Sequence, residues 1–400
     1  MTELISIAEA EALVAEHMPS FGSERVTLDR AAGRILRQRV HAEHDHPPFD
    51  RVMMDGIAVS WRASLPRAFT IGGAQMAGMA LQTLADDSGC IEVTTGAMLP
   101  AGCDCVIPVE QVRREAATYH LIDGYQPSRG QFIHPRGSDC VAGTLLLEAG
   151  MRIGAPEAAL LAANGVASVE VGKTPSIAIV STGDELVDVE SSLGEGQIRR
   201  SNDIAIATAL RLHGFDRVAL EHIADDIAAT QDTLGRLLGA YDVLILSGGV
   251  SMGQRDYVPA ALDALGVRRV FHRIAQRPGK PMWFGIGPGQ QAVFALPGNP
   301  VSALVCAIRY VRPALLVALG MTPAPKEYVR LGADVDGNAM LTCFVPAHVQ
   351  TDAQGWSIAR PVPARTSGDF SALPHTHGIV QLPPGNACTP AGTAVEFYRW

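Results

Sequence analysis

Two short runs of wholly apolar residues, 177–180 and 243–246, constrain the fold of this chain more than any other feature. Neither run alternates with polar residues, so each predicts a strand that is buried on both faces of a sheet. Helical patterns lie at 204–212, 227–238 and 256–265, where apolar residues recur every three or four positions. Buried strands that alternate with helices predict βαβ units, a parallel sheet and right-handed crossovers. The centre of the chain is therefore predicted to be an α/β layer around a parallel sheet.

Strand patterns dominate on both sides of this central block. From 49 to 140, short strand patterns such as 90–94 alternate with Gly and Pro turns. After a last helical pattern at 301–319, only short strand-like runs follow, including 340–345 and 378–382, and these predict a small β-barrel or sandwich. Because 400 residues exceed one ordinary core, several domains are expected.

The charge balance and the cysteines limit the class of protein. A formal net charge of −9 argues against nucleic acid or an anionic membrane as the main partner, while an anionic small ligand in a local basic pocket remains open. The seven cysteines form no C-x-x-C pair, so neither a disulfide framework nor a zinc ribbon is expected. The N-terminus lacks a basic segment followed by an apolar one, and Arg309 and Arg312 interrupt the longest apolar stretch. A cytoplasmic protein is expected.

Two loops rich in Gly and Ser follow the buried runs, at the edge where open α/β sheets bind ligands. The first is Ser181-Thr182-Gly183-Asp184-Glu185, and the second is Ser247-Gly248-Gly249-Val250-Ser251. Glycines let backbone N–H groups approach a phosphate, and serines add hydroxyl donors. Glycine turns after strands are common, however, so these loops alone are weak evidence for a ligand site.

Carboxylates lie near the same predicted edge. Asp225 and Asp226 follow another strand, and Asp256 lies just beyond the second glycine loop. Each could be no more than the N-cap of a helix. Together with Glu185 they would supply the oxygen ligands that Mg²⁺ prefers, usually shared with substrate phosphates. The pattern therefore predicts a metal and phosphate site, with Mg²⁺ as the cofactor.

Two stiff turns carry further candidates. Arg277-Pro278-Gly279-Lys280-Pro281 places two cations between prolines, which suggests an anion clamp or simply a solvated turn. Pro297-Gly298-Asn299-Pro300 leads into the last helix, whose N-terminus would suit an anion, although a purely structural turn fits equally well.

Six motifs, in the same order along the chain, resemble those of one family. Asp50-Arg51-Val52-Met53-Met54-Asp55-Gly56 resembles the D-R-x-x-M-D-G signature of the MoeA-type molybdenumtransferases, which include the E domain of gephyrin. Each motif is weak alone, but six in order are specific, and together they cover nearly the whole chain. The other five lie at 95–100 (with Glu110), 181–186, 247–257, 278–281 and 297–300.

This resemblance implies a multidomain α/β architecture. An elongated first domain would comprise residues 1–43 and 141–173, with a β-rich domain, 44–140, inserted into it. A Rossmann-like molybdopterin-binding domain would follow at 174–322, and a C-terminal β-barrel at 323–400. The resemblance also implies a homodimer, in which the third domain of one subunit and the second domain of the other share an active site.

The resemblance assigns roles to individual residues. Asp55, Thr95, Glu185 and Lys280 match catalytic positions, and Glu185 would also bind metal. The other metal ligands would be Asp256 and either Asp225 or Asp226. Residues expected to bind the ligand are Asp139, Ser247, Gly248, Gly249, Ser251, Arg277, Pro297, Gly298, Asn299, Pro300 and Ser367.

The chain departs from the family pattern in two places. Val52, Met53 and Ile57 replace the usual Ser-Ala and Tyr around the Met-Asp-Gly motif. In the predicted barrel, Pro346 occupies the place of a common Arg, and the loop 365–371 is altered as well. These changes concern oxyanion binding by the barrel, where an arginine of the loop, Arg365, is a possible substitute.

The reaction implied by the resemblance is transfer of molybdenum from molybdate to adenylylated molybdopterin, with release of AMP. One alternative is a paralogue that binds or carries molybdopterin or the finished cofactor. Another is a different enzyme on a similar third domain, such as the preceding adenylyltransferase or a nucleotide amidohydrolase. The signature at 50–56 and the predicted barrel argue against this second alternative. A scaffold role has no sequence signal, because no additional partner domain is evident.

Overall fold

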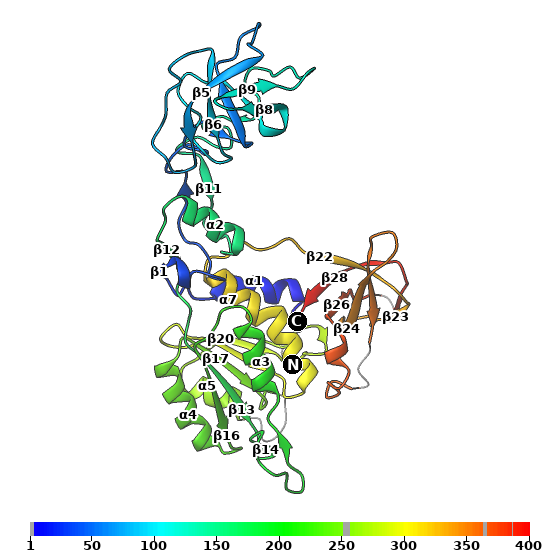
Figure 1. Cartoon of the computed structure of the whole chain (residues 1–400). Helices are drawn as coiled ribbons and strands as arrows, with labels where there is room; N and C mark the ends of the chain where they lie inside the picture. Colours follow the sequence, from blue (N-terminus) through cyan, green and yellow to red (C-terminus); the bar gives the residue numbers. More distant parts are fainter. Residues whose placement is uncertain (1–3, 251–256, 363–365, 386) are drawn as a thin grey trace. The chain divides into compact units, whose positions relative to one another are not determined.

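Figure 1 shows the computed structural model of the chain, which describes residues 4–250, 257–362, 366–385 and 387–400. The chain divides into two compact units. Unit 1 comprises Met1–Gln38, Ala149–Ala155 and Ser168–Trp400, and unit 2 comprises Arg39–Glu148 and Pro156–Ala167. The four predicted domains divide the chain more finely, and their boundaries stay predictions.

A six-stranded sheet forms the centre of unit 1, in the order β16-β13-β17-β21-β20-β18. The two apolar runs are confirmed as its buried strands, β13 (Ile177–Thr182) and β17 (Val243–Ser247), which pair in parallel. The remaining strands are β16 (Val218–Ile223), β18 (Arg268–His272), β20 (Trp283–Ile286) and β21 (Ala292–Leu296). Of these, β16 and β21 are parallel to their neighbours β13 and β17, while β20 pairs antiparallel with both β18 and β21.

Helices cover both faces of this sheet. Ile177 and Ile179 point to one face, where they share a core with α3 (Asn202–Arg211) and with the last helix of the layer. Ala178 and Val180 point to the other face, against α4 (Ile227–Ala240) and α5 (Val258–Ala264). Because successive side chains of a strand alternate between faces, a sheet covered on both sides requires unbroken apolar runs. The predicted Rossmann-like layer is confirmed. The prediction of a wholly parallel sheet is wrong, because β20 pairs antiparallel with β18 and β21.

The C-terminal part of unit 1 is a closed barrel, as predicted. Five strands pair around the ring in the order β24-β25-β22-β28-β26, and β26 returns to β24. Two-residue β19 (Gln276–Arg277) adds to β24 in parallel and so connects the barrel with the α/β layer. The barrel strands are β22 (Glu327–Leu331), β24 (Thr342–Thr351), β25 (Ser357–Pro361), β26 (Gly378–Leu382) and β28 (Ala394–Arg399).

Unit 2 is β-rich, as the sequence predicts. Its six-stranded sheet has the order β7-β4-β6-β5-β9-β8, with one apolar cluster on each face. Small ladders accompany it, among them β3 (Arg51–Val52) with β10 (Ile133–His134). The strands of the sheet are β4 (Gly56–Val59), β5 (Ala68–Gln75), β6 (Gly89–Val93), β7 (Cys105–Pro108), β8 (Val112–Glu115) and β9 (Thr118–Leu121).

Short elements complete the two units. In unit 1, α1 (Ile7–His17) has Ser6 as its N-cap, and β1 (Ser23–Thr27) pairs with β12 (Ser168–Gly172). In unit 2, β2 (Val40–His41) pairs with β11 (Leu145–Leu147). Helix α2 (Ala155–Ala163) begins at the boundary between the two units.

The last helix of the α/β layer contains a buried arginine. The helix runs as α6 (Pro300–Cys306), a π-helical turn (Ala307–Val311) and α7 (Arg312–Ala318). It is long and apolar enough to cross a membrane, but 72% of that stretch is buried inside the protein, as in a core helix. Arg309, in the π-helical turn, forms an ion pair with Glu11 of α1. It also stacks 4.4 Å from the ring centre of Tyr398 in the barrel. Arg309 thus joins the helix, α1 and the barrel.

We expect Arg309→Ala to lower the free energy of unfolding by about 2 kcal/mol, because loss of the buried guanidinium leaves a cavity and removes the partner of Gln381, whereas Glu11, 42% exposed, can turn to water. The matched control is Arg399→Ala, whose ion pair with Glu327 is exposed and should contribute at most about 1 kcal/mol. Thermal denaturation followed by tryptophan fluorescence measures both. An equal loss of unfolding free energy in the two variants would show that the buried Arg309 contributes no more to stability than the exposed Arg399.

Candidate functional site

The loops predicted to bind the ligand lie side by side at the carboxyl ends of three parallel strands. Strands β13, β17 and β21 end at Thr182, Ser247 and Leu296, and Ser247 is in register with both Ser181 and Leu296. The N–H of Gly248 donates to the carbonyl of Leu296 (3.1 Å). Open α/β sheets bind ligands at this edge.

The two glycines after β17 are required by close packing. Gly248 and Gly249 have φ angles of +102° and +64°, which side chains rarely allow. A Cβ on Gly248 would lie 2.7 Å from the hydroxyl of Thr182, and one on Gly249 would lie 2.8 Å from Cγ2 of Val258. Gly298 also approaches this loop, since its Cβ would lie 3.5 Å from Cα of Gly248. The predicted ligand residues Ser247, Gly248, Gly249 and Gly298 are therefore together, whereas Ser251 lies outside the described residues.

Asn202 connects the two loops, a role that the sequence did not reveal. Its side-chain Nδ2 donates to Ser247 Oγ (2.8 Å) and to the carbonyl of Gly298 (2.7 Å). In the structure the N-cap of α3 is Ser201, without a capping hydrogen bond from its side chain. An asparagine at the start of a helix reads as a cap in any sequence, so no local signal could have identified this role.

Several polar atoms at this edge lack a hydrogen-bond partner within the described protein, although one of them, Asp203 Oδ2, forms an ion pair with Arg200. They are Thr182 Oγ1, Asn202 Oδ1 and Asp203 Oδ2, all of them buried. Arg200 Nε lies 3.6 Å from Asp203 Oδ2, beyond hydrogen-bond distance. A buried polar atom without a partner typically costs about 1–3 kcal/mol, so such atoms mark places where water or a ligand binds.

The carboxylates of the edge divide into two kinds. Asp226 is the N-cap of α4, and its Oδ1 accepts from the N–H of Ala229 (2.8 Å). Asp225 instead donates its backbone N–H to Oδ1 of Asp184 (3.0 Å), and among the described residues no such capping bond involves its half-buried carboxylate. Asp225 is therefore the better candidate for a metal ligand.

Glu185 folds back toward the preceding loop. A Cβ on Gly183 would lie 2.5 Å from Glu185 Oε2, so only glycine leaves room for this carboxylate. Asp256 lies outside the described residues. Within the described ranges no three His, Cys, Asp or Glu side chains are close enough to hold a metal ion. The predicted metal site is thus not assembled from described residues alone, and it stays a prediction.

The loop 277–281, which carries Arg277 and Lys280, is held in place by a buried glutamine. Gln276 is wholly buried, and its Nε2 donates to the carbonyl of Pro278 (3.1 Å) while its Oε1 accepts from the hydroxyl of Tyr310. Gly279, at φ +97°, leaves room for Cys306, whose sulfur would lie 2.6 Å from a Cβ there. Arg277 and Lys280 are exposed on this braced loop, as an anion clamp requires. No local feature of the sequence indicates this role of Gln276.

The turn before α6 is covered by a loop that the barrel contributes. Asn299 Nδ2 donates to Ser367 Oγ (2.7 Å), and the N–H of Val301 donates to the carbonyl of Ser367 (3.2 Å). Ser367 therefore lies beside Pro297, Asn299 and Pro300, as expected. It also occupies one of the first free N–H groups of the helix, so the predicted anion site at this N-terminus is smaller than the sequence suggested. Arg365 lies outside the described residues.

The other predicted residues belong to unit 2. Asp55 Oδ1 accepts from both the N–H and the hydroxyl of Thr95, each at 2.7 Å. These two hydrogen bonds hold the pKa of Asp55 below its ordinary value, and the bond from the backbone N–H has the larger effect. The carboxylate therefore stays ionised at neutral pH. The glycine of the signature is explained by packing, because a Cβ on Gly56 would overlap the carbonyl oxygen of Ile107. Asp139 is hydrogen-bonded to His134 (2.7 Å).

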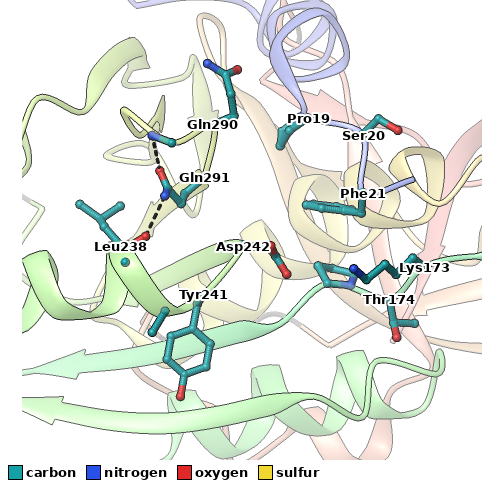
Figure 2. A pocket seen from close by; sticks show the side chains of 14 residues that line it. Pro19, Ser20, Phe21, Lys173, Thr174, Leu238, Tyr241, Asp242, Gln290 and Gln291 are labelled. Atoms are coloured by element: carbon teal, nitrogen blue, oxygen red, sulfur yellow. Dashed lines mark hydrogen bonds between the residues drawn. The ribbon is translucent and has the colours of Figure 1, made fainter. Parts of the chain in front are cut away.

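Figure 2 shows a hollow of about 350 Å³ at the opposite, amino-terminal edge of the central sheet. Asp242, which directly precedes β17, lines it, but its carboxylate already accepts from the N–H and hydroxyl of Ser176. Gln291 likewise donates to the carbonyl of Leu238 (2.7 Å). These polar groups of the hollow are therefore used in hydrogen bonds that stabilise the fold. None of the predicted ligand residues lines this hollow.

We expect Asn202→Ala to loosen the glycine loop, because the only side chain that ties Ser247 to Gly298 in the described structure is lost. Amide hydrogen exchange in peptides covering 247–249 should rise roughly tenfold, the equivalent of about 1.4 kcal/mol of local stability. Asn299→Ala is the control: exchange should rise at 366–368 instead, because Asn299 binds Ser367. Unchanged exchange at 247–249 in Asn202→Ala would contradict the assigned role.

Comparison with known proteins covers the whole chain. Residues 5–165 match the MoeA N-terminal region (domain I and II), residues 178–317 a probable molybdopterin binding domain, and residues 328–400 the MoeA C-terminal region (domain IV). A molybdopterin molybdenumtransferase of Synechocystis is 38% identical over 99% of this chain and 100% of its own length. One from Synechococcus elongatus is 33% identical over 93% of each chain.

Solved structures give the same answer. A molybdopterin biosynthesis MoeA protein from Pyrococcus horikoshii superposes with a TM-score of 0.83 and 26% identity over 100% of both chains. A second structure of a MoeA protein from this organism has a TM-score of 0.81 and 30% identity over 99% of both chains. The resemblance seen in the sequence is confirmed, and the chain belongs to the MoeA family of molybdopterin molybdenumtransferases.

Proposed function

We propose that this transferase of molybdenum cofactor biosynthesis moves molybdenum from molybdate to adenylylated molybdopterin and releases AMP. The observation that carries the proposal is the packed edge around Thr182, Gly248 and Gly249, where buried polar atoms lack partners. This edge lies within the residues that match a probable molybdopterin binding domain. A cytoplasmic location is part of the same proposal.

The residues of this edge divide the work of binding. Gly248 already gives its N–H to Leu296, so its contribution is the space that a missing side chain leaves. The N–H of Gly249 has no acceptor among the described residues, and it is free to donate to a phosphate oxygen. Lys280 and Arg277 supply positive charge from a rigid loop, which holds the anionic ligand in position for reaction.

Mg²⁺ fits the chemistry of two carboxylates at this edge. Glu185 and Asp225 offer the hard oxygen ligands that this ion takes, and Mg²⁺ commonly needs only one or two carboxylates beside substrate phosphates. When bound, the ion would supply charge that stabilises the leaving phosphate. Asp226 is less suited, because its carboxylate caps α4.

The direct test uses the purified chain with adenylylated molybdopterin, molybdate and Mg²⁺. AMP and molybdenum cofactor should appear in equal amounts, and neither should appear when molybdate or Mg²⁺ is omitted. Tight binding of molybdopterin without AMP release would instead support the alternative of a carrier paralogue.

The neighbouring aspartates give a matched pair of variants for this assay. Asp225→Ala should lower kcat/KM for AMP release roughly a hundredfold, about 2.7 kcal/mol, with an unchanged melting temperature. Asp226→Ala should leave the rate within roughly threefold and lower the free energy of unfolding by about 1 kcal/mol through loss of the helix cap. The reverse pattern would make Asp226 the metal ligand.

We also propose that the protein is a homodimer whose active sites combine residues of two subunits. Support comes from Met53 and Met54, which are 50% and 37% exposed next to Asp55 in unit 2. Large exposed apolar side chains beside a functional carboxylate suit a surface that a second copy covers.

Complementation tests this arrangement. Asp55→Ala and Asp225→Ala homodimers should each be inactive, but after subunit exchange the mixed dimers should hold one intact site of two. Random mixing predicts about a quarter of wild-type activity for a two-fold symmetric dimer. A mixture that stays inactive after verified exchange would place both residues in the site of a single subunit.

A further inference from the structure

A histidine of unit 2 lies between a cation and a carboxylate. His134 stands directly opposite Arg51 in the antiparallel ladder of β10 and β3, so both side chains lie on one face. Its Nδ1 is 2.9 Å from a terminal guanidinium nitrogen of Arg51. Its Nε2 is 2.7 Å from Oδ1 of Asp139. Arg51, His134 and Asp139 therefore form a continuous series of hydrogen bonds.

A tight turn brings Asp139 back to His134. The N–H of Ser138 donates to the carbonyl of Pro135 (3.1 Å), and Gly137 adopts the left-handed φ of +71°. The N–H of Asp139 then donates to the carbonyl of His46 (2.9 Å), which fixes its backbone. The other cation of the turn, Arg136, is paired with Asp45 at 2.7 Å and is directed elsewhere.

The donors and acceptors of this chain define the tautomer of His134. A guanidinium can only donate, so Nδ1 must accept from Arg51. The proton of the neutral ring then lies on Nε2, from where it donates to the carboxylate of Asp139, an acceptor when ionised. Asp139 keeps a side-chain exposure of 57%, which leaves its carboxylate accessible to a ligand.

We propose that His134 is a positioning residue for Asp139: held as the Nε2–H tautomer by Arg51, it fixes the orientation in which the Asp139 carboxylate meets the ligand. The inference rests on the proposed function and on the expectation, from the resemblance seen in the sequence, that Asp139 binds the ligand. Partners of this kind orient functional carboxylates, and their loss commonly costs roughly ten- to a hundredfold in affinity or activity.

A double-mutant cycle with AMP release as readout tests whether His134 acts through Asp139. His134→Phe should lower kcat/KM roughly tenfold, while His134→Gln, which keeps an N–H donor, should recover part of this loss. Asp139→Asn should have the larger effect on kcat/KM, and the double variant should equal Asp139→Asn alone. The effects of substitutions within one hydrogen-bonded network are not additive. Additive losses, or an unaffected His134→Phe, would overturn the proposal. The half-buried His120→Gln, on β9 of the same unit and away from Asp139, is the control and should change neither rate nor melting temperature.

The tautomer gives a readout that does not depend on activity. In protein labelled with ¹⁵N-histidine, long-range ¹H–¹⁵N correlation at neutral pH should show the Nε2–H tautomer for His134, assigned by its absence in His134→Gln. Arg51→Met should lower the fraction of the ring in this form, because no donor then keeps Nδ1 free of a proton while Asp139 still accepts from Nε2–H. A doubly protonated or Nδ1–H ring in the wild-type protein would overturn the proposal. A wild-type chain that released no AMP would refute the proposed function, whereas this spectrum would still decide whether Arg51 and Asp139 hold His134.

Discussion

The central sheet of unit 1 is buried on both faces, and this constraint governs where chemistry can occur. Strands β13, β17 and β21 have no face that reaches solvent, so polar groups that serve a ligand can stand only at the strand ends. At the carboxyl end, glycines allow the backbone of three loops to come together around Thr182. At the amino end, the polar side chains satisfy one another. The same packing that stabilises the fold thus separates one reactive edge from one structural edge.

The layer order and the glycine loops could be predicted because they depend on patterns local in the sequence. Apolar runs without alternation identify buried strands, and glycines after them identify close approach of the backbone. Asn202 and Gln276 could not be found in this way. Each acts through contacts with residues at least 30 positions away, Ser247 in one case and Cys306 or Tyr310 in the other. Nothing in the neighbouring sequence distinguishes them from an ordinary helix cap or a strand residue.

In unit 2, the resemblance to a family identified residues that composition and periodicity could not. Asp55 and Thr95 are 40 positions apart, yet both hydrogen bonds between them are formed. The structure also distinguishes two aspartates that are equivalent in the sequence, because Asp226 caps α4 and Asp225 does not. A smaller anion site before α6 could not be foreseen, since it depends on a barrel loop that reaches the helix from nearly 70 positions further along the chain.

The buried Arg309 has a consequence for modularity. Its charge is matched by Glu11 from the first helix and by Tyr398 and Gln381 from the last strands, so three regions distant in sequence complete one polar centre. An excised α/β layer would retain the cation and lose every one of these partners. The layer therefore cannot be transplanted as an independent cassette, and exchanges between relatives would have to carry α1 and the barrel along with it.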